Sequence, residues 1–398
     1  MIPFVNLIGQ RNAYKPELEQ AERAVFDSGC FIGGPAVSQL EANLAKFCGI
    51  GHAIACGSGT EALTVSLMAL GIAPGDEVIV PDFTFVAPAE CVAALSGIPK
   101  FADIDAETLQ ISPKSVESLV GPATRGIIAV DLFGQCAPYK ELREIANRHG
   151  LWILEDGAQA FGASVAQSPH LEPRRACTFG DIAITSFYPS KPLGCYGDGG
   201  AIFTDDAELA RKVRQIANHG SSEHYLHEIV GVNSRLDAIQ AAVLNVKFAH
   251  FEEELCKRRE NAAKYDAFFA NVEGIQPQRI AKGNTSTYAQ YTLLVDDRNA
   301  FIEKLKKTEI PYCIHYPMAL HCQPCFGELS HAASATDNLN GANATATLNC
   351  ASENATLNCA TGNATLNCAE VASTKAISLP VCAFTDVDTI IEKLRNVL

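Results

Sequence analysis

The sequence predicts an α/β fold in which a mostly parallel sheet is covered by helices on both faces. Short apolar segments alternate with amphipathic ones from about residue 16 to residue 220, and this alternation is typical of repeated strand–helix units. Hydrophobic residues make up 47% of the chain and charged residues 19%, so a large core can form. The 398 residues are enough for two domains, which we expect at residues 1–250 and 251–398.

The first expected element is a helix over residues 16–28, because proline is tolerated in a first turn and Gly29 can end a helix. A second helix is expected to follow residue 60 and to end at Leu70. Two more are expected over residues 85–96 and 138–149. Active sites in such folds lie beyond the carboxyl ends of the strands, so the residues that follow each strand are candidates for function. Strands are expected at residues 53–56, 77–80, 100–104, 126–130, 151–155 and 181–186.

The second part of the chain predicts a smaller α+β unit. It contains a long helical pattern over residues 236–264, a strand over 288–295 and a helix over 300–308. The sequence Ala-Thr-Leu-Asn-Cys then recurs at 346–350, 355–359 and 364–368. Three copies of nine residues are too few for a solenoid with its own core. We therefore expect an enlarged surface loop at about 332–370.

Charge and cysteine content restrict the environment and the partners. The net charge of −14 argues against a general nucleic-acid surface. No apolar run of about 18 residues is present, and the first residues do not resemble a signal peptide. We therefore expect a cytoplasmic protein whose fifteen cysteines are reduced. A zinc site at Cys322-x-x-Cys325 with His315 and His321 is an alternative, but it needs further ligands, and we expect no metal.

The strongest catalytic candidate is Lys191, in a loop of aromatic, proline and glycine residues directly after an apolar strand. Poor solvation lowers the pKa of a lysine and frees its amine to form a Schiff base with an aldehyde. An ordinary surface-loop lysine is the alternative explanation.

A carboxylate and an amide follow the preceding strand, at Asp156 and Gln159. A carboxylate beside the ring nitrogen of pyridoxal phosphate keeps that nitrogen protonated, which makes the ring a better electron sink. Gln159 could bind the 3-hydroxyl of the same ring. The alternative role for Asp156 is to cap a helix.

Two further features suit the same cofactor. Gly57-Ser58-Gly59-Thr60 opens a helix, where backbone N–H groups can bind a phosphate, and Ser186 could add a hydroxyl. Phe85 follows another strand and could stack on a planar ring, although a core phenylalanine is the usual explanation. Together these residues predict a pyridoxal-phosphate site.

At this point the sequence resembles the DegT-type sugar-nucleotide aminotransferases. The resemblance is carried by Ser186-Phe-Tyr-Pro-Ser-Lys191-Pro-Leu-Gly-Cys-Tyr-Gly-Asp-Gly-Gly200, Glu155-Asp156-x-Ala-Gln159, Gly59-Thr60-x-Ala-Leu63, Gly231-Val-Asn233-Ser-Arg235-Leu-Asp237 and His315-Tyr316-Pro317. It implies a fold-type I aminotransferase with a seven-stranded sheet, pyridoxal phosphate on Lys191, and a homodimer whose active sites lie between the subunits.

The resemblance also implies roles for individual positions. Asn233 would reach the phosphate of the partner's cofactor, and Arg235 would meet the partner's substrate through its guanidinium fork. The positions that match the sugar-nucleotide pocket are Gly29, Phe31, Ser190, His315 and Tyr316. His315 and Tyr316 could equally be packing residues.

Within the family, the motifs most resemble enzymes that aminate a UDP-linked 3-keto acetamido-hexuronate with glutamate as donor, in amino-sugar synthesis for surface polysaccharide such as O-antigen. The alternatives are a 4-keto sugar-nucleotide aminotransferase and a cofactor-binding regulatory protein without turnover. A sugar dehydratase on this fold would carry histidine at the position of Lys191, which argues against that activity.

Overall fold

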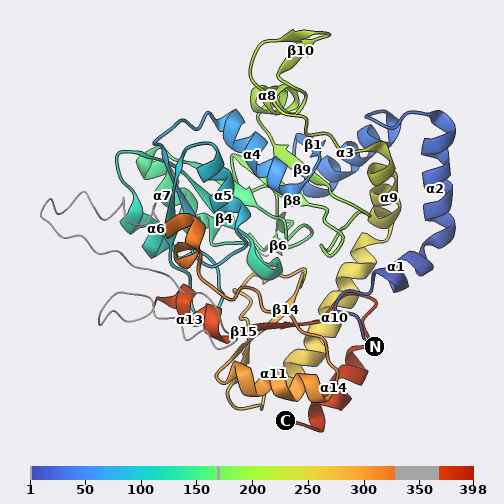
Figure 1. Cartoon of the computed structure of the whole chain (residues 1–398), viewed down its shortest axis with the longest axis vertical. Coiled ribbons are helices and arrows are strands. Elements are labelled where there is room, and N and C mark those ends of the chain that lie inside the picture. The colour runs from blue at the N-terminus through green and yellow to red at the C-terminus, as the bar shows by residue number, and fades with distance from the viewer. Residues whose placement is uncertain (1, 168–170, 328–366) are drawn as a thin grey trace, which may run out of the picture.

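The computed structural model describes residues 2–167, 171–327 and 367–398. Its central sheet has seven strands: β1 His52–Cys56, β2 Glu77–Pro81, β3 Ile98–Ala102, β4 Thr124–Val130, β5 Trp152–Asp156, β8 Ile182–Ser186 and β9 Gly200–Thr204. Their order is β1-β9-β8-β5-β4-β2-β3 (Figure 1). Strand β9 is antiparallel to both of its neighbours, and the other pairs are parallel. Six strands therefore run in one direction, and the predicted mostly parallel sheet is confirmed.

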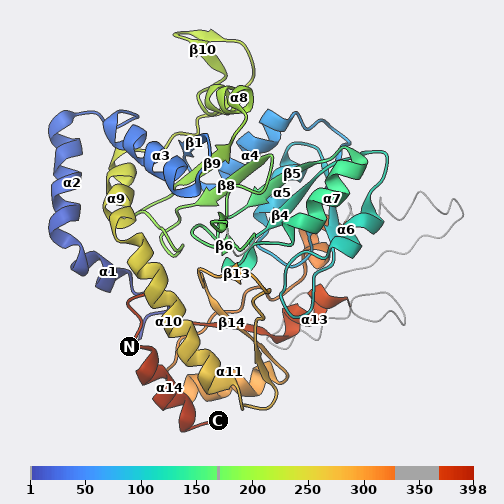
Figure 2. The same ribbon diagram turned by 180° about the vertical axis from the view of Figure 1, so that it is seen from behind.

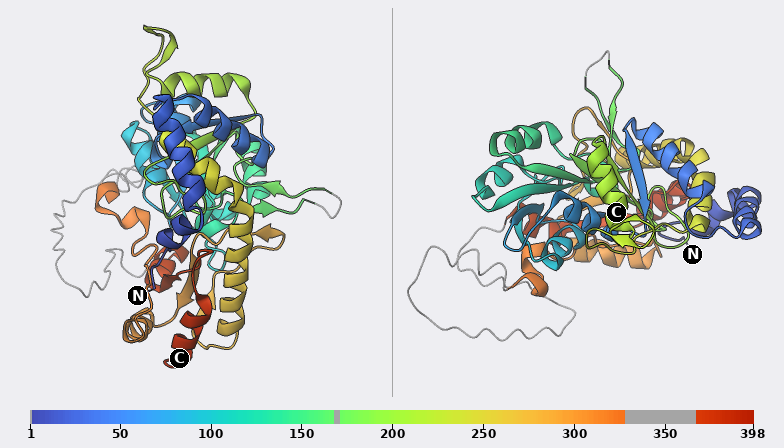
Figure 3. Two further views of the ribbon diagram at one scale, coloured as in Figure 1. Left: turned by 90° about the vertical axis from the view of Figure 1, so that its right-hand side faces the viewer. Right: turned by 90° about the horizontal axis from the view of Figure 1, so that it is seen from above.

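Helices lie on both faces of this sheet, as the view from above shows (Figure 3). The β1 side chains show why both faces need cover, because Ile54 packs into the core on one side and Ala53 into the core on the other. Strands that are apolar on both sides are typical of parallel sheets between two helical layers. The helices of these layers are α3 Pro35–Cys48, α4 Gly59–Leu70, α5 Ala87–Ala94, α6 Pro113–Leu119, α7 Tyr139–His149, α8 Ala207–Ala217 and α9 Ala238–Ala249.

Two helices precede these layers, α1 (Leu7–Ala13) and α2 (Lys15–Ser28). Helix α2 confirms the helix predicted over residues 16–28. It has a proline in its first turn, and it ends at Gly29, which adopts the left-handed conformation with φ of 65°. A residue with a Cβ is strained in that conformation, so glycine suits this helix end.

The prediction of one continuous helix over residues 236–264 is wrong. The structure has two helices there, because α9 ends at Ala249 and α10 spans Phe251–Phe269. His250 separates them with φ of −105° and ψ of 2°, outside the helical range. Seen from behind, α9 and α10 follow one another along one side of the molecule (Figure 2). We propose that the predicted boundary between the two domains, near residue 250, lies at this break.

A second core forms beyond α10. Strands β12, β14 and β15 make an antiparallel sheet that packs with α10, α11 and α14, as expected for a smaller α+β unit. Its strands are Ile275–Pro277, Tyr291–Val295 and Ala376–Leu379, and its later helices are Arg298–Lys307 and Val387–Arg395. The strand predicted over 288–295 therefore begins three residues later, because Tyr288 has a φ of 45°, which is incompatible with a strand.

Smaller elements complete the described residues. Strands β10 (Ser221–Glu223) and β11 (Leu226–His227) form a hairpin that projects from the body at the top of Figure 1. The remaining elements are the strands β6 Ser164–Val165, β7 Arg174–Arg175 and β13 Asn284–Thr285, the helix α13 Cys368–Lys375, and the 3₁₀ turns η1 Leu132–Gly134, η2 Leu320–Cys322 and η3 Pro324–Phe326.

The bounds of several predicted elements differ in the structure, and one predicted segment lies mostly outside the described residues. Strand β3 lies two residues before its predicted range, and α5 is shorter at both ends. The predicted surface loop at 332–370 lies outside the described residues except for its last four. Of these, Asn367 caps α13 and the other three begin it. Seven cysteines of the described ranges, Cys48, Cys56, Cys91, Cys136, Cys177, Cys195 and Cys382, are buried thiols outside any disulfide, in agreement with the prediction of reduced cysteines. Among the helices of the described ranges, none is long and apolar enough to cross a membrane.

Candidate active site

The predicted cofactor residues other than Asn233 gather at one edge of the central sheet. Strands β1, β2, β5 and β8 run in the same direction, so their carboxyl ends meet at the same edge. Ser58, Phe85 and Lys191 follow the ends of β1, β2 and β8, and Asp156 is the last residue of β5. We call the residues there the lysine group: Ser58, Gly59, Thr60, Phe85, Asp156, Gln159, Ser186, Ser190, Lys191, His315 and Tyr316.

Lys191 and Asp156 influence each other electrostatically within this group. Burial lowers the pKa of Lys191, and the charge of Asp156 raises it in part. Burial also raises the pKa of Asp156, while the Ala158 N–H and the charge of Lys191 act in the opposite direction. A lysine with a lowered pKa is more often a neutral amine, which is the form that attacks an aldehyde.

Asp156 does not cap a helix, so the alternative explanation of this residue is wrong. One carboxylate oxygen, Oδ1, accepts a hydrogen bond from the Ala158 N–H at 3.0 Å, but a turn rather than a helix follows β5. Among the described residues, the other oxygen has no hydrogen-bond partner. A buried carboxylate with an unused oxygen fits the protonated ring nitrogen of pyridoxal phosphate.

Gln159 and Tyr316 are brought together from distant parts of the chain. The Gln159 amide donates to the Tyr316 hydroxyl at 3.2 Å and accepts from the Phe133 N–H at 2.8 Å. The exposed ring of Phe85 lies 6.2 Å from the ring of Tyr316. Phe85 is thus not the core phenylalanine of the alternative explanation, and its ring remains accessible to a planar ligand.

The glycine-rich loop lies directly against Ser186. Ser58 caps α4 by accepting the Glu61 N–H, and the first N–H groups of any helix lack a partner within the helix. A Cβ built on Gly59 would stand 2.7 Å from the Ser186 Cβ, so only glycine fits this close approach. The loop, the helix N-terminus and the Ser186 hydroxyl together suit a phosphate.

This close approach predicts the effect of adding one methyl group. We expect Gly59→Ala to raise the Kd for pyridoxal phosphate by about tenfold or more, because overpacking costs about 1–3 kcal/mol. Equilibrium dialysis measures the Kd. Gly121→Ala is the matched control, since its added Cβ would lie no closer than 3.7 Å to the nearest atom. Equal Kd values for Gly59→Ala and the wild type would contradict a phosphate site at this loop.

His315 is held neutral in the lysine group. Burial and the positive charge of Lys191 lower its pKa to about 4, and its Nδ1 lies 3.0 Å from the Ser378 hydroxyl. An unfolded histidine has a pKa of about 6.5. Between these two values the unfolded chain binds more protons than the folded chain, so the free energy of unfolding rises with pH.

We therefore expect His315→Gln to flatten the dependence of stability on pH between about 4 and 6.5. The wild-type slope from this residue is at most about 1.4 kcal/mol per pH unit. Urea unfolding at a series of pH values measures it. An unchanged slope in the variant would mean that His315 is not held neutral in the folded protein.

A second set of predicted residues, Gly29, Phe31, Asn233 and Arg235, lies beside the start of α9; we call it the arginine group. The Phe31 carbonyl accepts the Ala238 N–H at 2.9 Å. Asn233 and Arg235 are exposed, while Ser234 between them is buried and accepts the Gly57 N–H at 3.4 Å. The Asn233 and Arg235 side chains therefore point away from the interior of their own subunit.

Sequence reasoning missed a residue that supports the loop after Lys191. Lys247 on α9 is 1% exposed, donates from Nζ to the Gly194 carbonyl at 2.6 Å and lies 4.0 Å above the Tyr196 ring. It therefore holds the loop that follows Lys191. No local pattern distinguishes it, because lysine is common on helices and only the packing of α9 makes it buried.

The residues of the alternative zinc site do not come together as a set. His315 lies in the lysine group, and Cys325 is exposed. His321 and Cys322 are close neighbours, but their third companion is Glu370, which sequence spacing did not indicate. The two segments meet only because α13 packs beside η2.

Known proteins resemble this chain over most of its length. Residues 12–356 match the DegT/DnrJ/EryC1/StrS aminotransferase family. The chain is 46% identical to the UDP-2-acetamido-2-deoxy-3-oxo-D-glucuronate aminotransferase of Pseudomonas aeruginosa, over 82% of this chain and 89% of that protein. A solved DegT DnrJ EryC1 StrS aminotransferase from Brucella abortus has a TM-score of 0.85 and 33% identity, covering 100% of this chain and 99% of the other. NtdA from Bacillus subtilis, solved with bound cofactor PMP, has a TM-score of 0.83 and 26% identity, covering 100% and 85%.

Proposed function

Because the chain belongs to the DegT/DnrJ/EryC1/StrS aminotransferase family, we propose that it transfers an amino group from glutamate to a UDP-linked 3-keto acetamido-hexuronate. It is a pyridoxal-phosphate-dependent aminotransferase, as its family is. The observation that carries the site assignment is the pair of the partly buried Lys191 and the buried Asp156 at the carboxyl edge of the sheet. Few other functions need an amine of lowered pKa opposite a carboxylate with an unused oxygen.

Each residue of the lysine group would have a different role in binding the cofactor or in catalysis. Pyridoxal phosphate, when bound, supplies an aldehyde that accepts the amino group and a ring that withdraws electrons. The Ser58–Thr60 loop and Ser186 would hold its phosphate, and Phe85 would cover its ring. Asp156 would keep a proton on the ring nitrogen. The Lys191 Nζ would take and return the proton at the reacting carbon, which is general acid–base catalysis.

The proposed sugar rests on a relative and on the chemistry of Arg235. The Pseudomonas aeruginosa relative is an aminotransferase of a 3-oxo glucuronate on UDP. A hexuronate carries a carboxylate, and an exposed guanidinium can bind a carboxylate through two parallel hydrogen bonds. We further propose that the reaction takes place in the cytoplasm, where free thiols such as those of this chain persist, and that the amino sugar is used for surface polysaccharide such as O-antigen.

Product analysis tests this function directly. The purified enzyme is incubated with glutamate and either the 3-keto or the 4-keto form of the UDP-linked sugar. We expect one 2-oxoglutarate for each amino sugar, with nitrogen on carbon 3 by nuclear magnetic resonance. Amination of the 4-keto sugar alone would overturn the proposed position. An enzyme that converts neither sugar, although glutamate is consumed stoichiometrically, would overturn the sugar class. No reaction with glutamate would overturn the donor.

We also propose a homodimer in which each active site uses both subunits. In the single chain, the residues of the arginine group are exposed. Apolar side chains near this group and on the projecting hairpin are exposed as well. Gathered exposed apolar residues often mark a protein–protein interface. The exposed apolar side chains are Phe26, Phe31, Ile32, Tyr225, Leu226, Ile229 and Val230. Association would cover them and bring Arg235 of one subunit to the lysine group of the other.

Pairing two inactive subunits tests the shared site. Lys191→Ala and Arg235→Ala chains carry different tags, are co-expressed, and are purified on both tags. If Arg235 serves the partner's site, each mixed dimer contains one intact site and should have about half of the wild-type activity. If Arg235 serves its own subunit, both sites of the mixed dimer are defective. A mixed dimer as inactive as the parents would therefore contradict the proposal.

A further inference from the structure

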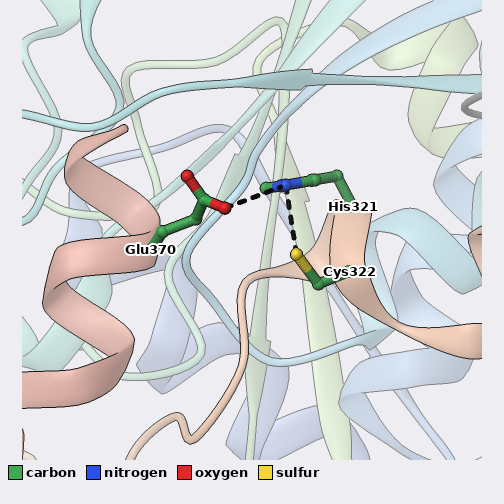
Figure 4. Close-up of side chains that lie close together, drawn as sticks. All are labelled: His321, Cys322 and Glu370. Atoms are coloured by element: carbon green, nitrogen blue, oxygen red, sulfur yellow. Dashed lines mark hydrogen bonds and ion pairs between the residues drawn. The ribbon is translucent and has the colours of Figure 1, made fainter. Parts of the chain in front are cut away.

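Three side chains with metal-binding atoms meet outside the lysine group (Figure 4). His321 and Cys322 belong to η2, and Glu370 belongs to α13. Their ligand atoms all lie within 4.8 Å of one another. The His321 Nε2 is 3.1 Å from the Cys322 Sγ and 3.8 Å from the Glu370 Oε1.

A buried carboxylate fixes the orientation of the histidine ring. Asp82, which is 1% exposed, lies 2.6 Å from the His321 Nδ1 and also accepts the His321 backbone N–H at 2.9 Å. A carboxylate at Nδ1 holds the proton there and leaves the lone pair of Nε2 for a ligand. Metal-binding histidines almost always donate the other ring N–H to a carboxylate, a backbone carbonyl or water, and Asp82 provides such a carboxylate.

The glutamate side chain is also held by a hydrogen bond. The Glu370 Oε2 accepts the Asn367 N–H at 2.9 Å, which leaves Oε1 on the side of His321. The start of α13 is anchored because the Asp103 carboxylate accepts the N–H groups of Cys368 and Ala369 at 3.1 and 3.0 Å. The Asn367 amide also donates to Asp82. The three ligand atoms therefore face one point from two fixed segments.

We propose that His321, Cys322 and Glu370 bind one zinc ion. Nitrogen, sulfur and oxygen are all zinc ligands, and three protein ligands leave the fourth tetrahedral position to water. Tetrahedral bonds of about 2.0–2.3 Å place neighbouring ligand atoms roughly 3.3–3.6 Å apart. The three ligand atoms lie within 4.8 Å of one another, so side-chain shifts on the order of 1 Å close the site. The thiolate argues against magnesium and calcium, which prefer oxygen. The ion would fasten η2 to α13 beside the end of β2.

Cobalt substitution of the full-length holoenzyme is the first test. The metal-free holoenzyme is titrated with Co²⁺, and the difference spectrum is followed for the thiolate-to-cobalt charge-transfer band. We expect one equivalent of Co²⁺, displaced by one Zn²⁺, with the band lost in Cys322→Ser. Cys325→Ser is the matched control, because this exposed thiol lies three positions away, and it should keep the band. A band that survives in Cys322→Ser or disappears in Cys325→Ser would overturn the ligand set.

The affinity for zinc provides a second test. This test remains valid even if Cys322→Ser does not fold. Isothermal titration with Zn²⁺ should give one site per chain, with affinity lowered about 10–100-fold in Asp82→Asn and at least as much in Glu370→Gln. Zinc should raise the unfolding temperature of the wild type and not that of Glu370→Gln. If the wild type binds no zinc, the three residues do not form a metal site. The same conclusion follows if Asp82→Asn and Glu370→Gln both bind zinc with the affinity of the wild type.

Discussion

Replacing Lys191 with alanine is expected to lower kcat by roughly 10³-fold or more. The variant loses both the amine that attaches the cofactor and the group that moves the proton, and a positioned acid–base group contributes about 10²–10⁴-fold alone. Two measurements check this. The rate of 2-oxoglutarate formation gives kcat, and mass spectrometry of the borohydride-reduced protein shows whether residue 191 carries the mass of the cofactor.

The fold should tolerate this change, because burial already opposes the charge of Lys191. Lys282→Ala is the control for an ordinary loop lysine, since Lys282 is exposed, and it should keep the wild-type kcat and cofactor mass. If Lys191→Ala still turned over at the wild-type rate, the assignment of the catalytic amine would be wrong. Loss of turnover together with loss of the folded circular-dichroism spectrum would instead require the comparison to be repeated with Lys191→Met.

Asp156→Asn is expected to have the second-largest effect, a loss of about 10²–10³-fold in kcat. Removing one preorganised electrostatic partner typically has an effect of this size. The asparagine oxygen can still accept the Ala158 N–H that Oδ1 accepts in the wild type, so local structure is preserved while the charge is lost. Steady-state assays give kcat, and thermal unfolding checks that stability is retained.

The same assays distinguish catalysis from structure at this position. Burial raises the pKa of Asp156, so a neutral amide should not weaken folding there. Asp206→Asn is the matched control, because Asp206 caps α8 by accepting the N–H groups of Glu208 and Leu209. It loses the same charge far from the site and should leave kcat unchanged. An Asp156→Asn variant with normal kcat and lowered stability would show that the acid is only structural.

Local patterns in the sequence were enough to indicate Asp156, Lys191 and the glycine-rich loop as candidates. Asp156 and Lys191 follow apolar segments that are predicted to be strands. Parallel strands have their carboxyl ends at one edge of a sheet. The family resemblance then supplied Asn233, Arg235 and Tyr316, whose local context carries no such pattern. Strand β9 (Gly200–Thr204) was missed, because it follows a glycine-rich segment and its antiparallel pairing depends on β1 and β8, far away in the sequence.

The sequence by itself determined the fold class, the cofactor and the residues that follow each strand, since these depend on periodicity and on short motifs. Only the tertiary structure decided which distant side chains meet. The pKa values of Lys191, Asp156 and His315 depend on burial, which no single segment specifies. The hydrogen bond from Gln159 to Tyr316 joins residues 157 positions apart. Such contacts arise from the packing of whole elements, so spacing along the chain cannot reveal them.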